Sequence, residues 1–215
     1  MPYPSEHRER TRDRIVRSAQ VLFNRHGFDA VSIDQVMSGA GLTRGGFYTY
    51  FDRKSDLYAA AIALALGEPP SARWAGVSVD FSAVDAARQV IAAYLSHQHF
   101  EDIDGSCPLV ALPSDVSRSD PAVKRVFEAV FKAMVDLFEQ SVRRGRSKDR
   151  QRALAMAGIC VGGMVVARSL DDRHLADALR QAAMSVALQL GGWPKSRQRS
   201  EGKSAAKSNR SPQRS

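Results

Sequence analysis

Arg44, Gly45 and Gly46 stand together in a stretch whose residue types suit hydrogen bonding to a nucleic acid. An arginine guanidinium can donate two hydrogen bonds to O6 and N7 of guanine, and glycines let a backbone approach the bases closely. Hydroxyl groups and an ammonium near this tripeptide can reach phosphate oxygens. The residues that we predict to contact DNA are Ser32, Thr43, Arg44, Gly45, Gly46, Tyr48, Thr49, Tyr50 and Lys54.

Within this set, Arg44 is predicted to be the main base reader, and the other side chains are predicted to position the backbone of the DNA. Two alternatives stay open from the residues themselves. The rings of Tyr48 and Tyr50 could instead be half-buried packing groups with solvated hydroxyls. Lys54 could instead be a solvated surface charge.

These residues need a helix that begins at a defined position, and the preceding sequence supplies one. Ser32 and Gln35 have the spacing of a capping box, in which each side chain bonds to the other residue's backbone amide. Val31 and Val36 occupy the positions of a hydrophobic staple. A first helix is therefore predicted to begin at Ile33.

A second helix is predicted after a glycine turn. Gly41 follows Ala40 where a left-handed residue would end the first helix, and Thr43 can cap the next one. Phe47 would then pack into the core together with Leu42. Two short helices joined in this way over residues 32–51 are typical of a helix-turn-helix motif, whose second helix enters the DNA major groove.

The flanking segments predict a small three-helix domain over residues 1–67. Apolar residues recur at helical spacing between residues 11 and 26, and Gly27 is predicted to end that helix. Asp52 is a candidate cap for a further helix that runs to Gly67. The Pro-rich stretch at 68–71 then marks a domain junction.

Residues 68–190 predict a second, larger all-α domain. Helical patterns cover residues 81–99, 108–117, 121–144, 148–170 and 172–190, and no alternating run is long enough to predict a sheet. Pro108 and Pro121 suit the first position of a helix, where the missing amide has no partner to lose.

Charge and composition fit a cytoplasmic DNA-binding protein better than a membrane or secreted one. The net charge is +8, but residues 191–215 hold seven Lys/Arg against one Asp/Glu, so most of the excess lies in a tail predicted to be disordered. The longest charge-free run, 153–167, is too short to span a membrane. Cys107 and Cys160 show no metal spacing, and no cofactor or metal is predicted.

The stretch from Gly41 to Leu57, with Gly27-Phe28 and Ser32 before it, resembles the DNA-binding domain of the TetR/AcrR family of bacterial transcriptional regulators. Departures from the family pattern are Phe47 for the usual Leu, Tyr50 for the common His and Arg53 for the usual Ser. The resemblance implies a ligand-responsive repressor that binds a pseudo-palindromic DNA operator as a homodimer. It also implies that the second domain binds an effector and forms the dimer.

An effector site is predicted between the helices of the second domain, where this family builds its cavities. Aromatic and polar residues there would suit a small apolar or aromatic ligand, although an aromatic stripe at this spacing could equally be core packing. The predicted pocket residues are Tyr94, His97, Phe100, Cys107, Phe127, Phe131 and Met134. Cys107 precedes Pro108 at a predicted helix N-terminus, where amide dipoles can lower a thiol pKa, so a redox or electrophile sensor is an alternative.

A dimer interface is predicted on the last two helices because small residues there allow close helix approach. A segment that is apolar nearly all round must be buried, and the same helices of a second subunit are the natural partner. An interface within one chain is the alternative. The predicted contact residues are Gly158, Gly162, Met164, Leu179, Ala183 and Val186.

Two other classes of protein compete with this interpretation. An enzyme is disfavoured because His97 and His99 lack metal-ligand spacing and no nucleophile-elbow or phosphate-loop motif occurs. A non-specific DNA-architectural protein that binds through its basic tail would show salt-dependent binding without sequence preference.

Overall fold

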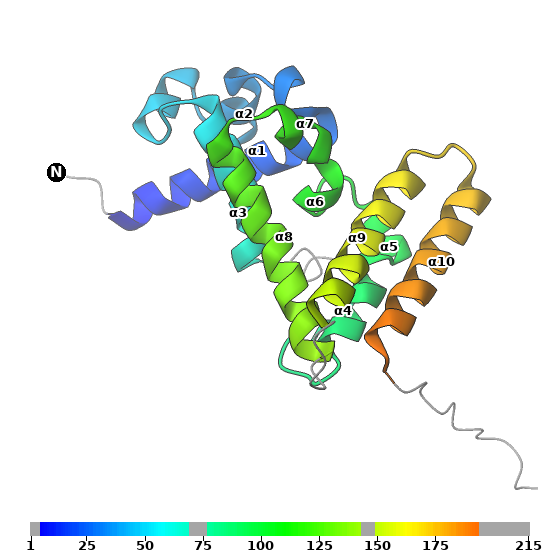
Figure 1. The fold of residues 1–215 in the computed structure, drawn as a ribbon. Helices are drawn as coiled ribbons and strands as arrows, with labels where there is room; N and C mark the ends of the chain where they lie inside the picture. The colour runs from blue at the N-terminus through cyan, green and yellow to red at the C-terminus, as the bar shows by residue number, and fades with distance from the viewer. Residues whose placement is uncertain (1–4, 69–76, 143–148, 194–215) are drawn as a thin grey trace, which may run out of the picture.

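The computed structural model describes residues 5–68, 77–142 and 149–193, and every regular element within these ranges is helical (Figure 1). The predicted all-α fold class is confirmed. The predicted disordered tail lies outside the described residues from position 194 onward, as does most of the predicted domain junction. No helix in the described ranges is long and apolar enough to cross a membrane.

The N-terminal region is a small helical domain around one apolar core. Its elements are α1 (Ser5–Ala30), α2 (Ile33–Gly39), the 3-10 helix η1 (Arg44–Thr49) and α3 (Lys54–Gly67). Helix α1 packs on both α2 and α3, and α2 packs on η1. Four apolar side chains are fully buried between these elements: Ile15, Phe23, Phe47 and Leu57. Their burial stabilises the domain because it removes apolar surface from water.

Helix α1 is kinked near its end. Gly27 has φ 78° and ψ 175°, a combination that side-chain-bearing residues rarely adopt, and the chain resumes a helical turn up to Ala30. The predicted helix end at Gly27 is therefore a kink, after which the helix continues to Ala30. Helix α3 begins at Lys54, so the predicted cap Asp52 is wrong by one position: Arg53 occupies the cap and makes no side-chain capping bond.

The second region contains three long helices and several short ones. They are α4 (Ala86–Tyr94), α5 (His97–Glu101), α6 (Pro108–Ala111), α7 (Pro113–Arg118), α8 (Pro121–Val142), α9 (Asp149–Arg168) and α10 (Arg173–Gly191). Helix α8 packs on α3 and runs to the opposite end of the molecule, where α9 and α10 lie side by side as an antiparallel pair (Figure 1).

Two predicted helices are each broken in two. The predicted helix 81–99 begins only at Ala86, because Asp80 accepts hydrogen bonds from the amide and hydroxyl of Ser82 in a local turn. It then breaks where Ser96 caps α5 by accepting the His99 amide. The predicted helix 108–117 breaks at Pro113, which has no amide to continue the ladder of α6.

Polar bonds join the two regions at the kink of α1. The Phe28 amide donates to Asp115 Oδ2 at 2.8 Å, and the Asn24 side-chain amide donates to the Asp104 and Ser106 carbonyls at 2.9 and 3.0 Å. Arg25 makes two hydrogen bonds to the Asp104 carboxylate. Because these bonds come from one helical turn, they fix the direction in which α1 leaves the second region.

We predict that Gly27→Ala lowers the free energy of unfolding by about 1–3 kcal/mol, since the new residue must adopt a strained backbone conformation. A Cβ atom at Gly27 would also lie 2.7 Å from Asp115 Oδ2. The measurement is urea unfolding of the variant beside Gly67→Ala, whose Cβ would have no neighbour within 4 Å. Equal stability of the two variants would contradict the role given to this kink.

Candidate nucleic-acid interface

The first helix of the motif begins as predicted. Ser32 Oγ accepts the Gln35 amide at 3.2 Å, and Gln35 Oε1 accepts the Ser32 amide at 2.7 Å, which together form the capping box. Val31 and Val36 are both buried at the predicted staple positions. These local bonds define where α2 starts and leave Ser32 at the surface.

The turn between the two elements also follows the prediction. Gly41 has φ 67°, in the left-handed region, and the Leu42 amide donates to the Met37 carbonyl at 2.8 Å. The second element differs in two respects. It is a 3-10 helix, and the predicted Thr43 side-chain cap is absent because the Gly46 amide already donates to the Thr43 carbonyl at 3.1 Å.

The first turn of η1 presents a charged and open surface. Arg44 is 61% exposed, and its Nη1 atom lies 2.6 Å from Asp34 Oδ2 on the first turn of α2. A Cβ atom at Gly45 would meet nothing within 4 Å, whereas one at Gly46 would lie 3.5 Å from Met37 Cε. Gly45 therefore faces open space, and Gly46 lies on the packed side of the element.

The remaining predicted contact residues divide between surface and packing positions. Tyr48 is 61% exposed, with its ring edge-on to Phe47 at 5.2 Å, so its hydroxyl can reach a partner outside the chain. Thr43 and Thr49 are also exposed, whereas Tyr50 is half-buried against the core. The open alternative of half-buried packing thus describes Tyr50 and does not describe Tyr48.

Lys54 has an internal role that the sequence did not predict. Its Nζ atom donates to the Phe28 carbonyl at 2.5 Å and lies 4.3 Å from the centre of the Phe28 ring. Burial lowers the pKa of Lys54, although the charge of Asp29 opposes this shift. The ammonium therefore joins α3 to the end of α1, which is neither of the two sequence interpretations.

Three arginines of α1 contact the helix-turn-helix motif or the residues next to it. Arg8 donates to the Thr49 carbonyl at 3.0 Å, and Arg14 donates to the Ala40 carbonyl at the end of α2. The Arg12 guanidinium lies 5.0 Å from the centre of the Phe51 ring. These roles are not predictable from the sequence, since their only signal is an arginine-rich helix whose orientation relative to the motif is a long-range property.

The predicted effector residues do not line either of two cavities in the described structure. Tyr94, Phe100, Cys107 and Met134 are buried in the core, Phe127 and Phe131 are half-buried, and His97 is exposed. A cavity of about 160 Å³ lies at the junction of the two regions and is lined in part by Phe28, Tyr58, Asp115 and Arg118. Another of about 780 Å³ lies at the far end of α8 and is lined in part by Phe81, Leu137, Asp149 and Trp193.

Cys107 lies in an environment unlike that of a reactive thiol. It precedes a helix of only four residues and is 4% exposed. Burial raises the pKa of the Cys107 thiol, which is opposite to the lowering expected at a helix N-terminus. A buried thiol of raised pKa is mostly protonated at neutral pH, so the structure does not favour the sensor alternative.

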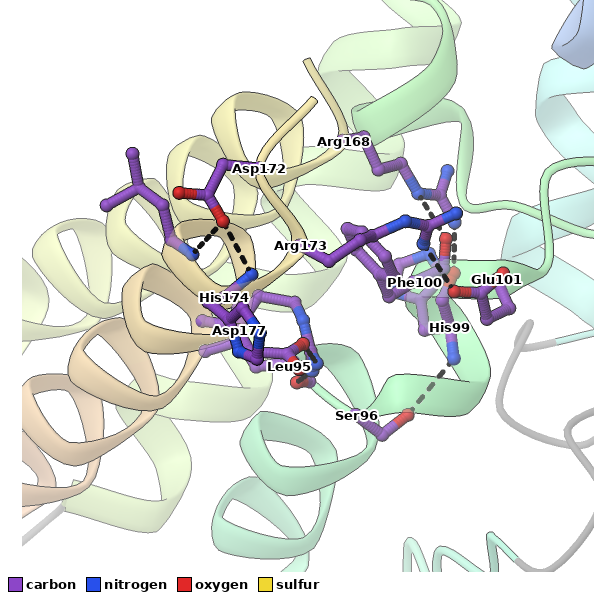
Figure 2. A network of polar contacts seen from close by, with 12 residues as sticks. Leu95, Ser96, His99, Phe100, Glu101, Arg168, Asp172, Arg173, His174 and Asp177 are labelled. Carbon is purple, nitrogen blue, oxygen red and sulfur yellow. Dashed lines mark hydrogen bonds and ion pairs between the residues drawn. The ribbon is translucent and has the colours of Figure 1, made fainter. Parts of the chain in front are cut away.

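A polar network surrounds α5 next to this cysteine (Figure 2). Arg168, in the last turn of α9, donates to the carbonyls of His99, Phe100 and Asp102 and to the Ser106 hydroxyl. The guanidinium therefore satisfies carbonyls at the end of α5 that have no helical partner. The Arg173 side chain reaches Glu101 of the same turn at 2.7 Å.

His99 is fully buried within this network and is neutral. Its Nδ1 atom lies 2.6 Å from the Tyr94 carbonyl, which requires the proton on that nitrogen, and Nε2 accepts the Cys107 amide at 3.4 Å. Burial, together with the charge of Arg168, lowers the pKa of His99 to about 3, although the bond to Tyr94 opposes this shift.

The predicted interface residues divide between the inside and the outside of the α9–α10 pair. Met164 is fully buried and Ala183 is 8% exposed, so both pack within the subunit. Gly158, Gly162 and Val186 are exposed on the outer face, and Leu179 is half-buried. The outer face also carries the exposed apolar side chains of Leu154, Val166 and Leu175.

Comparison with known proteins finds relatives of the N-terminal region among bacterial regulatory proteins. Residues 15–61 match a family model described as bacterial regulatory proteins, tetR family. The uncharacterized HTH-type transcriptional regulator YfiR of Bacillus subtilis (strain 168) is 30% identical over 63 residues, which are 29% of this chain and 31% of YfiR. The similarity therefore spans less than a third of that relative.

Solved structures extend the similarity in fold to most of the chain. A TetR transcriptional regulator from Chloroflexus aurantiacus J-10-FL has a TM-score of 0.62 at 22% identity, and the match covers 84% of this chain and 93% of that one. The structure of SmeT in complex with triclosan has a TM-score of 0.59 at 20% identity, with 84% and 90% covered. Both structures share the fold of the two regions.

We predict that the buried neutral His99 makes the free energy of unfolding depend on pH. Because its pKa is about 3 in the folded chain and near 6.5 when unfolded, its contribution is complete above pH 6.5 and is lost as the pH falls toward 3. The limiting slope is about 1.4 kcal/mol per pH unit. Urea unfolding between pH 7 and 5 should therefore show a shallower pH dependence for His99→Gln than for the parent.

The matched control for this prediction is His97→Gln, because His97 is exposed on the same helix. It should retain the pH dependence of the parent. If His99→Gln retains it as well, His99 is not the group that titrates.

Proposed function

We propose that this chain, whose residues 15–61 match the model of the tetR family of bacterial regulatory proteins, is a sequence-specific DNA-binding transcriptional regulator. We further propose that it is a ligand-responsive repressor that binds a pseudo-palindromic operator as a homodimer. The observation that carries the proposal is the exposed first turn of η1, held by a capped α2 and by the arginines of α1.

The exposed turn supports base reading because it combines a donor with an open approach. Arg44 begins the element, and Gly45 beside it leaves space for an approaching base pair. A bidentate arginine contact to guanine discriminates against other bases by about 1–3 kcal/mol. Ser32 and Tyr48 flank this turn at the surface, where their hydroxyls suit phosphate contacts.

Arg44→Ala is expected to reduce the discrimination between operator and scrambled duplexes by about 1–3 kcal/mol. The operator is first obtained by selecting bound fragments from a random DNA library with the full chain. Affinities for both duplexes are then compared at one salt concentration. Tyr48→Phe, which removes only a proposed phosphate contact, should weaken binding to both duplexes equally. An unchanged ratio for Arg44→Ala would remove it from the base-reading role.

The outer face of α9 and α10 supports a homodimer. Small and apolar residues are exposed there over both helices, while the inner face of the same pair is buried in the subunit. A second copy of the same face would cover these residues in a four-helix arrangement with two-fold symmetry. Of the predicted interface residues, Gly158, Gly162 and Val186 suit this contact. Met164 and Ala183 instead pack inside the subunit, beneath this face.

Gly162→Leu is expected to convert the dimer to a monomer without unfolding the subunit. A Cβ atom at Gly162 would meet nothing within 4 Å in the subunit, so the leucine adds bulk only to the outer face. Light scattering over a range of protein concentrations measures the mass, and circular dichroism reports the fold. A monomeric parent, or a variant that stays dimeric, would contradict this interface.

The neighbouring Gly163 provides the control for this experiment. A Cβ atom there would lie 2.7 Å from the Ala183 Cβ, between α9 and α10 of the same subunit. Gly163→Ala should therefore lower the stability of the subunit, whereas Gly162→Leu should not.

Response to a small molecule is proposed from the fold and from the bonds between the two regions. SmeT, which shares this fold, is described in complex with triclosan. In this chain, the segment between α5 and α6 bonds to α9 through Arg168 and to α1 through Asn24. A ligand that moves this segment would move the DNA-binding region, so ligand and operator would weaken each other's affinity by the same factor.

A further inference from the structure

Asp34 places a negative charge on the surface that we propose for DNA binding. It lies in the first turn of α2, with 55% of its side chain exposed, and its carboxylate is 2.6 Å from Arg44 Nη1. A carboxylate beside DNA phosphates is repelled by them, so this residue opposes binding in general. Its position beside the proposed base reader therefore needs a reason other than affinity.

Stability of the fold does not supply that reason. An exposed ion pair contributes little to the free energy of unfolding, because solvent screens the charges and the side chains lose freedom. Helix α2 is already fixed by the capping box of Ser32 and Gln35, and η1 is fixed by Arg8 and by its buried Phe47. The Asp34–Arg44 pair is thus available for another role.

We propose that Asp34 is a specificity-determining residue, which acts by orienting Arg44 and by discouraging it from binding phosphate. This inference rests on the proposed function of the chain. The guanidinium has five N–H donors in a fixed plane, and Asp34 occupies Nη1 from one side. Donors remain for a bidentate contact to guanine while the pair with Asp34 is kept.

A phosphate contact has a different electrostatic cost. When Arg44 leaves Asp34 for the DNA backbone, the carboxylate stays unpaired in the negative field of the DNA. Asp34 therefore penalises the sequence-independent contact of Arg44 more than the base contact. Specificity rises because binding to the wrong DNA is made weaker.

The test compares the parent chain with Asp34→Asn on the selected operator and on a scrambled duplex of equal length. In Asp34→Asn, Arg44 becomes free to contact a phosphate, so the log–log salt dependence on scrambled DNA should steepen by up to about 0.9. When the salt concentration is lowered from 200 to 50 mM, the affinity of the variant for scrambled DNA should therefore rise by up to about 3.5-fold more than the affinity of the parent does. Operator affinity should change less, so the specificity ratio falls.

The control for charge is Asp136→Asn, which removes the same charge from α8, where Asp136 forms an exposed ion pair with Arg150 of α9. Glu139 still pairs with Arg150 in that variant, so the fold is preserved. Its specificity ratio and salt dependence should equal those of the parent. In an Arg44→Ala background, Asp34→Asn should leave the specificity ratio equal to that of Arg44→Ala alone, since Asp34 changes specificity only through Arg44.

The outcomes separate the two proposals. A parent chain that shows no preference for any selected DNA overturns the proposed function. A parent with a clear preference that Asp34→Asn leaves unchanged overturns the role of Asp34. The role of Asp34 is also overturned if Asp34→Asn binds both duplexes more tightly by the same factor, or if Asp136→Asn has the same effect. In either case the charge of Asp34 would act only through the overall electrostatic field of the protein.

Discussion

The fold depends on positive side chains that bind the unpaired carbonyl groups at the ends of its helices. Every helix leaves its last carbonyls without an amide partner, and short helices have few other contacts to compensate. In this chain Arg14 binds the end of α2, Lys54 the end of α1, Arg168 the end of α5 and Arg180 the end of α4. Each cation comes from a different element than the carbonyl it binds, so each bond closes one end of a helix and joins two helices at once.

The junction of the two regions shows why such bonds matter for reading DNA. Gly27 turns the end of α1 so that the Phe28 amide faces Asp115, while the Phe28 carbonyl faces Lys54. The Phe28 ring packs on Tyr58, which is buried with its pKa raised by desolvation. A dimer can match two half-sites only if each DNA-binding region holds a fixed direction relative to the dimer helices. The kink supplies that direction through the Phe28–Asp115 bond, while Lys54 and Tyr58 hold the end of α1 against α3.

Sequence reasoning predicted the features that depend on neighbouring residues. The Ser32–Gln35 capping box and the left-handed Gly41 were both predictable, because their bonds close within a few residues. The breaks at Ser96 and Pro113 also carry local signals, but the helical period continues across both residues and predicts unbroken helices. The roles of Arg14 and Lys54 could not be predicted, since each depends on the angle at which α1 crosses another element.

The internal use of cations also changes what the net charge means for DNA binding. The chain has a formal charge of +8, yet Arg14, Lys54, Arg168 and Arg180 are bound to carbonyls of the fold. Arg44 itself is paired with a carboxylate on the proposed DNA-binding face. Cations that are bound within the fold contribute less to phosphate binding, so we expect a lower non-specific affinity and a smaller salt dependence than the net charge alone implies. In the proposed homodimer, tight binding would come mainly from reading two half-sites at once, which would make the spacing imposed by the dimer part of its specificity.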